Sequence, residues 1–193
     1  MTEQQPPADD ELRYEPLTFD NAPALAALFK ERDVWRNFGY EAEPSSFVLR
    51  MRLRQGDMTG LLAFRPSTER YVAFVICFGM PGPDAELEYA IAVPDPVERR
   101  RGVGKLVGPY STDYYFDNNL CKKLWAWGDV NNAAMIALAK ACDLDFVGYE
   151  EKGRQMVDGH TKTVAVQMTK DRWAEKKARR AAASTAPPTS TEG

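Results

Sequence analysis

The sequence predicts an α/β fold of the α+β kind, with a mixed central sheet of about six to seven strands flanked by about four helices. Two observations predict it. Segments with an apolar side chain at every second position, typical of strands, alternate along the chain with longer amphipathic stretches typical of helices. Some neighbouring strands are joined by short turns and others by a helix, which predicts both antiparallel and parallel pairing. At 193 residues, the chain is long enough for one domain with a substantial core.

The strands follow from their apolar patterns. The strand at residues 71–78 is apolar on both faces, so we place it in the middle of the sheet. A hairpin joins it to the strand before it, because residues 65–70 have the composition of a tight turn. A second turn is expected at residues 157–160. The expected strands span residues 12–17, 60–64, 71–78, 86–93, 122–128, 145–151 and 162–169.

Helices are expected between these strands and after the last one. They begin after Asp20 or Asn21, run from Ser45 or Ser46 to Gln55, and then span residues 105–118, 131–141 and 171–183. Residues 35–43 are expected to form an aromatic loop that packs on the core or forms a wall of a substrate pocket. We expect a disordered acidic tail at residues 1–10, one domain at 11–173, and a basic helix with a disordered tail at 174–193.

Composition excludes several classes of function. The net charge of -3 argues against broad nucleic-acid binding, and the sequence has no apolar run long enough to span a bilayer. Its three cysteines lie far apart in apolar segments, as expected of free thiols in a reducing compartment. A single histidine, His160, excludes a His-rich metal site. We therefore expect a cytoplasmic protein without a metal, either a monomer or a homodimer.

Residues 86–105 join a strand to a turn suited to phosphate. Leu87 and its alternate neighbours form an apolar face, and Pro94 and Pro96 then end the pairing because proline cannot donate to a ladder. A basic, glycine-containing turn follows and opens a helix. The first turn of a helix presents unpaired backbone N–H groups and a partial positive charge, which together bind phosphate. The turn reads Arg99-Arg100-Arg101-Gly102-Val103-Gly104-Lys105.

The pattern Arg99-x-x-Gly102-x-Gly104 between a strand and a helix resembles the acetyl-CoA-binding segment of the GCN5-related N-acetyltransferase (GNAT) family. The segment that begins Asn131-Asn132-Ala133-Ala134 resembles that family's Asn-bearing helix, and its pattern is closest to the ribosomal-protein N-terminal acetyltransferase-like branch. There are two departures. Cys142-Asp143 replaces the usual Gly-Phe, and Leu138 stands in place of a frequent Tyr that is often the general acid.

The resemblance implies a GNAT fold with splayed strands at an acetyl-CoA cleft. In that family the pantetheine arm pairs, like an extra strand, with the strand that precedes the phosphate turn. The arginines could instead be a solvated loop, and Asn131 could cap its own helix. The residues implied to contact acetyl-CoA are Ile91, Ala92, Val93, Arg99, Arg100, Arg101, Gly102, Val103, Gly104, Lys105, Asn131 and Ala134.

Transfer of an acyl group to an amine needs a base and a group that stabilises the oxyanion. We expect the base to be Glu88 or, after it, Glu86, because both leave the apolar side of their strand. The alternative is that they pair with nearby arginines. Backbone N–H groups near Ala92 and Val93 are expected to polarise the thioester carbonyl.

These features predict an acetyl-CoA-dependent N-acetyltransferase. It would transfer an acetyl group to a primary amine, on a protein N-terminus, a lysine or a small molecule, by direct attack in a ternary complex. The alternative is a non-catalytic CoA- or acyl-CoA-binding module, which the departures at Leu138 and Cys142-Asp143 favour. A nucleotide site of another class is excluded by the absence of a Gly-Lys-Ser/Thr ending.

Overall fold

The structure, a computed structural model, describes residues 11–38, 40–150, 155–156, 159–160 and 162–185. Its centre is a seven-stranded sheet in the order β1-β2-β3-β4-β5-β9-β6. Only β4 and β5 are parallel, so the sheet is mixed, as predicted. The strands are β1 (Arg13–Pro16), β2 (Met58–Arg65), β3 (Arg70–Phe78), β4 (Glu86–Ala92), β5 (Lys123–Asp129), β6 (Asp145–Glu150) and β9 (Thr163–Thr169).

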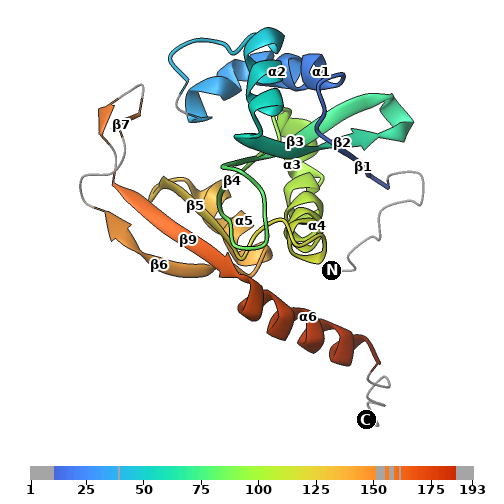
Figure 1. The fold of residues 1–193 in the computed structure, drawn as a ribbon, viewed down its shortest axis with the longest axis vertical. Helices are drawn as coiled ribbons and strands as arrows, with labels where there is room; N and C mark the ends of the chain where they lie inside the picture. The colour runs from blue at the N-terminus through green and yellow to red at the C-terminus, as the bar shows by residue number, and fades with distance from the viewer. Residues whose placement is uncertain (1–10, 39, 151–154, 157–158, 161, 186–193) are drawn as a thin grey trace.

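Helices cover both faces of the sheet (Figure 1). On one face, α1 and α2 bury a core around Phe29 and Phe74, and on the other, α4 and α5 bury a second core around Tyr115 and Leu124. The helical elements are α1 (Ala22–Lys30), η2 (Glu31–Phe38), α2 (Ser46–Gln55), η3 (Pro66–Thr68), α3 (Pro96–Arg100), α4 (Val103–Asp117), α5 (Ala133–Ala141) and α6 (Lys170–Thr185).

Three expected elements differ from those observed. The aromatic segment expected as a loop begins as a 3-10 helix, η2. Two of the residues expected in the turn at 157–160 instead form the short strand β8 (Gly159–His160), which pairs with β7 (Gln155–Met156), and residues 157–158 are outside the described residues. The expected tails at residues 1–10 and 186–193 are also outside them.

The third difference is α3, a short helix at the place where the sequence predicted only a turn. Its signals are local: the Asp95 carboxylate accepts a hydrogen bond from the Val97 N–H at 2.7 Å, and Pro96 is at the first helical position. Proline suits that position because its missing N–H would have no partner there. Two prolines therefore end the strand and also begin a helix.

A buried ion pair holds α3 against the sheet. The Arg65 guanidinium, at the end of β2, is 2.7 Å from the Glu98 carboxylate, and their side chains are only 2% and 9% exposed. The exposed Arg101 side chain is 3.5 Å from the same carboxylate. Because α3 leads directly into α4, this pair fixes the position of the predicted phosphate turn.

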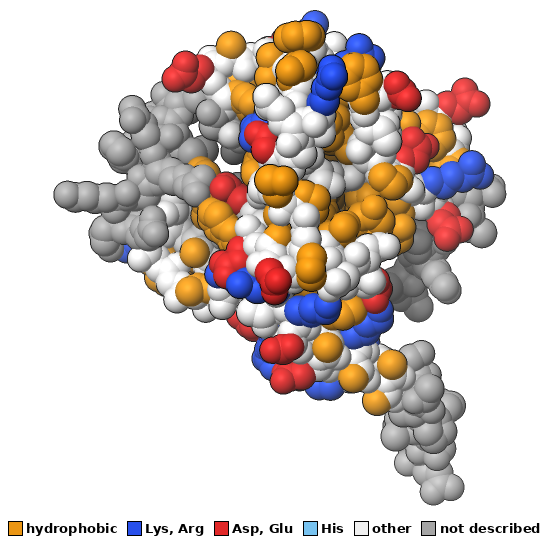
Figure 2. Space-filling view, viewed as in Figure 1, with side chains coloured by type: hydrophobic (Ala, Val, Ile, Leu, Met, Phe, Trp, Pro, Cys, Tyr) orange, Lys and Arg blue, Asp and Glu red, His pale blue; other side chains and the backbone are white. Residues whose placement is uncertain are grey.

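The C-terminal helix α6 projects from the body (Figure 1) but begins as part of it. Trp173 stacks on Phe116 of α4, and the Lys176 side chain is buried with its Nζ 3.2 Å from Asp145. Figure 2 shows basic and acidic side chains next to one another around this helix, and Lys177 of α6 is 2.6 Å from Asp117 of α4. The first turns of α6 therefore pack against the body of the domain.

Glu98→Ala is expected to lower the free energy of unfolding by about 3 kcal/mol or more, because it leaves the buried Arg65 guanidinium without this carboxylate. The matched control is Arg101→Ala, which removes an exposed contact to the same carboxylate and is expected to cost less than about 1 kcal/mol. Urea denaturation measures both. A loss for Glu98→Ala no larger than that of the control would contradict the anchoring role.

Candidate functional site

The parallel strands β4 and β5 separate part-way along their length. They pair at only three positions, ending with Glu88 opposite Trp125. Beyond that point β4 continues along β3 to Ala92, while β5 continues along β9 to Asp129. The two strands are therefore held apart by their outer neighbours. This confirms the splayed strands expected from the sequence and leaves strand edges with unpaired backbone groups facing the gap.

Because its side chains alternate, β4 has two different faces beside the gap. Leu87 and Tyr89 are buried against α4, as are the partly buried Ile91 and Val93. Ala90, next to Glu88 on the opposite face, packs toward the core under α1 and η2. One face of the strand is therefore fixed on a helix, and the other carries the predicted base beside small side chains.

Tyr89 fixes β4 on α4. Its hydroxyl forms a 2.6 Å hydrogen bond with Ser111 Oγ and a 3.3 Å bond to the Gly108 carbonyl. Burial raises the Tyr89 pKa well above its ordinary value, so this hydroxyl stays protonated in the core.

The N-terminus of α4 lies at the end of β4. A Cβ on Gly104 would be 3.8 Å from the Val93 side chain and 3.6 Å from that of Leu138. Gly102 precedes the helix with φ at 76°, and no side chain caps this helix end. The N–H groups of Arg101 and Gly102 already bond to carbonyls of α3.

Consequently, the helix N–H groups best placed for an anion are those of Val103 and Gly104, whose own helix offers them no acceptor. Space is available there, because a Cβ built on Gly102 would meet no atom within 4 Å.

The basic turn residues divide into two groups. Arg99 bends back to the end of β4, where its Nε donates to the Val93 carbonyl at 2.5 Å and its Nη2 to the Pro94 carbonyl at 3.2 Å. Its main contact is thus with the protein backbone. Arg100 and Lys105 are exposed on either side of Gly102. Together with the exposed Arg101, they surround this helix end with positive charge.

Asn132, rather than Asn131, caps α5. The Asn132 side chain accepts a hydrogen bond from the Met135 N–H at 3.0 Å, whereas the Asn131 backbone N–H bonds to Asp129. The capping alternative for Asn131 is therefore wrong. Asn131 and Ala134 are both exposed at the start of α5, where a ligand can reach them.

The two candidate bases have different surroundings. Glu88, half-buried, accepts a hydrogen bond from the indole N–H of Trp127 at 2.6 Å. Glu86 is exposed and pairs with Lys123 at 2.8 Å and with Lys122 at 3.6 Å. The hydrogen bond from Lys123 is the main cause of the lowered pKa of Glu86. A carboxylate with a lowered pKa is a poorer base, which argues against Glu86 as the base.

The sequence did not reveal the contact between Trp127 and Glu88, which lie 39 residues apart. The alternation of apolar residues in the two strands does indicate that both side chains lie on the same face of the sheet. Both residues face away from the α4 side of the sheet, because Leu87 and Leu124, one and three positions earlier, are buried in the core on that side.

An aromatic segment borders the gap on the Glu88 side. Phe38 of η2 packs on Phe74 with ring centroids 5.3 Å apart, and Phe74 is the β3 partner of Ala92. On β5, Trp125 and Trp127 are half-buried. Phe38 and Tyr40 also pack on Phe29, so the alternative in which the aromatic segment packs on the core is confirmed.

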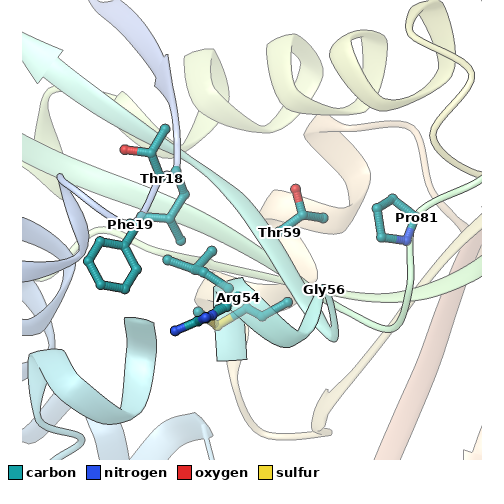
Figure 3. Close-up of a pocket in the computed structure, with 9 residues that line it drawn as sticks. Thr18, Phe19, Arg54, Gly56, Thr59 and Pro81 are labelled. Atoms are coloured by element: carbon teal, nitrogen blue, oxygen red, sulfur yellow. The ribbon is translucent and has the colours of Figure 1, made fainter. Parts of the chain in front are cut away.

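A separate cavity of about 370 Å³ lies at the C-terminal end of α2 (Figure 3). No residue that lines it belongs to β4 or β5. Arg52 stacks over Phe78, the β3 partner of Glu88, with its guanidinium carbon 4.8 Å from the ring centroid. The cavity is lined by Leu17, Thr18, Phe19, Leu53, Arg54, Gly56, Met58, Thr59 and Pro81.

The described part of the chain holds no cluster of three or more His, Cys, Asp or Glu side chains placed to bind a metal ion. Among the helices within it, none has both the length and the apolar character needed to cross a membrane.

No protein-family model matches the sequence, and no curated protein matches it. Solved structures do match the fold. Spermidine N-acetyltransferase from Vibrio cholerae, in complex with CoA and spermine, superposes with a TM-score of 0.71 at 12% identity, covering 84% of this chain and 98% of that one. This chain has the GNAT fold.

Two further structures agree with the GNAT fold. Ribosomal-protein-S5-alanine acetyltransferase from Vibrio fischeri superposes with a TM-score of 0.69 at 11% identity, covering 84% of this chain and 94% of that one. AAC(6')-Ib, in complex with paromomycin and acetyl-CoA, superposes with a TM-score of 0.65 at 12% identity, covering 87% and 98%. The fold expected from the sequence is thus confirmed.

Gly104→Val is expected to weaken acetyl-CoA binding about tenfold or more, because a branched side chain would enter the space beside the α4 N–H groups. The matched control is Gly104→Ala, whose Cβ makes only ordinary contacts with Leu138 and Val93 and which should fold normally. Calorimetric titration with acetyl-CoA, alongside thermal unfolding, measures both effects. Unchanged affinity in a folded Gly104→Val variant would remove this helix end from the binding site.

Proposed function

We propose that the protein is an acetyl-CoA-dependent N-acetyltransferase that transfers the acetyl group to a primary amine by direct attack in a ternary complex. The observation that carries the proposal is the gap between β4 and β5. The gap begins beyond the half-buried Glu88, where the pairing of β4 with β5 ends. The N-terminus of α4, which no side chain caps, lies at the other end of the same segment of β4. A carboxylate and an anion-binding helix end therefore lie at opposite ends of one short strand segment.

The residues present fit acetyl-CoA in two ways. The N–H groups of Val103 and Gly104, with the exposed Arg100 and Lys105, would hold the pyrophosphate, since a helix N-terminus with open space before it favours anions. The edge of β4 beyond Glu88, which β5 leaves unpaired, would accept the amide groups of the pantetheine arm as a further strand. The bound cosubstrate supplies the activated acyl group.

In the proposed reaction the amine nitrogen attacks the thioester carbonyl carbon. Glu88 takes the amine proton, directly or through a water molecule, and backbone N–H groups near Ala92 and Val93 stabilise the oxyanion. The carbon–sulfur bond then breaks and CoA leaves as a thiolate. Leu138, which would contact a Cβ at Gly104 and Gly108, has no proton to give it, so the thiolate takes its proton from water.

The proposed acceptor is a primary amine on a protein N-terminus, a lysine or a small molecule. The matching structures support amines of very different size, since they are a spermidine acetyltransferase with bound spermine, a ribosomal-protein-S5-alanine acetyltransferase and AAC(6')-Ib with bound paromomycin. We propose a cytoplasmic location, because all three cysteines are buried free thiols, as in a reducing compartment. The proposed oligomeric state is a monomer or homodimer.

The second candidate is a non-catalytic CoA- or acyl-CoA-binding module. The observation that favours it is the apolar packing of Leu138 against α4, which leaves this position without a proton donor. A thiol-release assay over a panel of primary amines, run beside calorimetric titration with CoA, separates the two. CoA binding without release on any amine would favour the module.

Glu88→Gln is expected to lower turnover on the order of a hundredfold at neutral pH, because the amide keeps the shape of the side chain but loses its basicity. The loss should fall on kcat, with little change in acetyl-CoA affinity. It should also shrink as pH rises, since more of the amine is then already deprotonated. Near-normal turnover from neutral to alkaline pH would exclude Glu88 as the base.

Glu86→Gln, the same change two residues earlier on the same face, is expected to lower kcat less than about threefold. Glu86 is exposed and paired with Lys123, which lowers its pKa. Steady-state rates for both variants at one pH make the comparison. A larger loss for Glu86→Gln than for Glu88→Gln would reverse their roles.

A further inference from the structure

The side chain that contacts the proposed base comes from the opposite wall of the gap. Trp127 lies on β5, two residues beyond the last position that pairs with β4. Its indole N–H donates to Glu88 Oε1 at 2.6 Å. This hydrogen bond bridges the gap at the point where the main-chain pairing has just ended, and both side chains are half-buried there.

The chemistry of an indole suits this contact. The indole N–H is a donor only, so it cannot take the proton that a base is meant to receive. A carboxylate has two oxygens and about four acceptor positions, and the indole bond occupies one position on Oε1. The rigid ring also restricts the torsions of a glutamate side chain that would otherwise be highly flexible.

We propose that Trp127 is a positioning residue of the acetyl transfer, which holds the Glu88 carboxylate toward the gap. The inference rests on the proposed function, in which Glu88 takes the amine proton.

The test replaces the indole with a ring that lacks its N–H. Trp127→Phe is expected to lower kcat on the order of tenfold, as for loss of a hydrogen bond to a charged group, with the KM for acetyl-CoA within twofold of its original value. Loss of a donor to a carboxylate favours the protonated form. The acid limb of the kcat profile should therefore move to higher pH.

The chain supplies a matched control. Trp173 donates its indole N–H to Asp113 Oδ1, also at 2.6 Å, but between α6 and α4 and away from the gap. Trp173→Phe removes the same kind of bond from a site without a proposed role in the reaction. It is expected to lower thermal stability while the acid limb of the pH profile stays in place.

The outcomes separate the two proposals. If Glu88→Gln lowers turnover but Trp127→Phe leaves the acid limb unmoved, the role of Trp127 is overturned and the proposed function stands. If Glu88→Gln leaves turnover unchanged, the role of Glu88 as base and that of Trp127 both fall, while the proposed acetyl transfer itself stands. In the Glu88→Gln background, Trp127→Phe should cause no further loss of kcat, and a full second loss would also overturn the positioning role.

A measurement on the folded wild-type protein covers the case in which Trp127→Phe does not fold. The indole N–H resonance of Trp127, assigned by through-bond NMR, should change with pH as Glu88 titrates. The change should disappear in Glu88→Gln, while the Trp173 resonance is the same in both proteins. A Trp127 resonance that is indifferent to Glu88→Gln would overturn the inference.

Discussion

The candidate site depends on one constraint in the sheet, which is that β4 and β5 are neighbours for only three residue pairs. Each of the two strands forms a longer ladder with the strand on its outer side. Five positions join β4 to β3, and seven join β5 to β9. Closing the gap would require breaking those outer ladders, so the unpaired edges of both strands remain available. A ligand that offers amide groups along one of these edges completes a ladder that the protein itself leaves open.

The elements around the gap are fixed by polar contacts that are buried or nearly so. The Arg65–Glu98 pair anchors α3, and the hydroxyl of Tyr89 ties β4 to α4 through Ser111. The N-terminus of α4 therefore has a defined position relative to β4 before any ligand arrives. A prearranged anion site of this kind loses little conformational entropy on binding, which suits a cosubstrate as long and flexible as acetyl-CoA.

The sequence predicted the parts of this arrangement that depend on local chemistry. Alternation in β4 predicted which side chains face α4, and the glycine-containing turn predicted the start of a helix near Gly102. The sequence did not predict α3. Pro94 and Pro96 indicate the end of a strand, but Asp95 before Pro96 is also a signal for the start of a helix. The bond between Trp127 and Glu88 depends on strand register across 39 residues, which no local pattern determines.

A crystal structure with a non-hydrolysable acetyl-CoA analogue tests the central claim most directly, namely that the gap between β4 and β5 is the site of acyl transfer. The account predicts that the pantetheine arm lies along β4 from Tyr89 to Ala92, with the pyrophosphate at the N-terminus of α4 and the acyl carbon on the Glu88 side. An analogue bound in the cavity beside Arg54, with the gap empty, would contradict it.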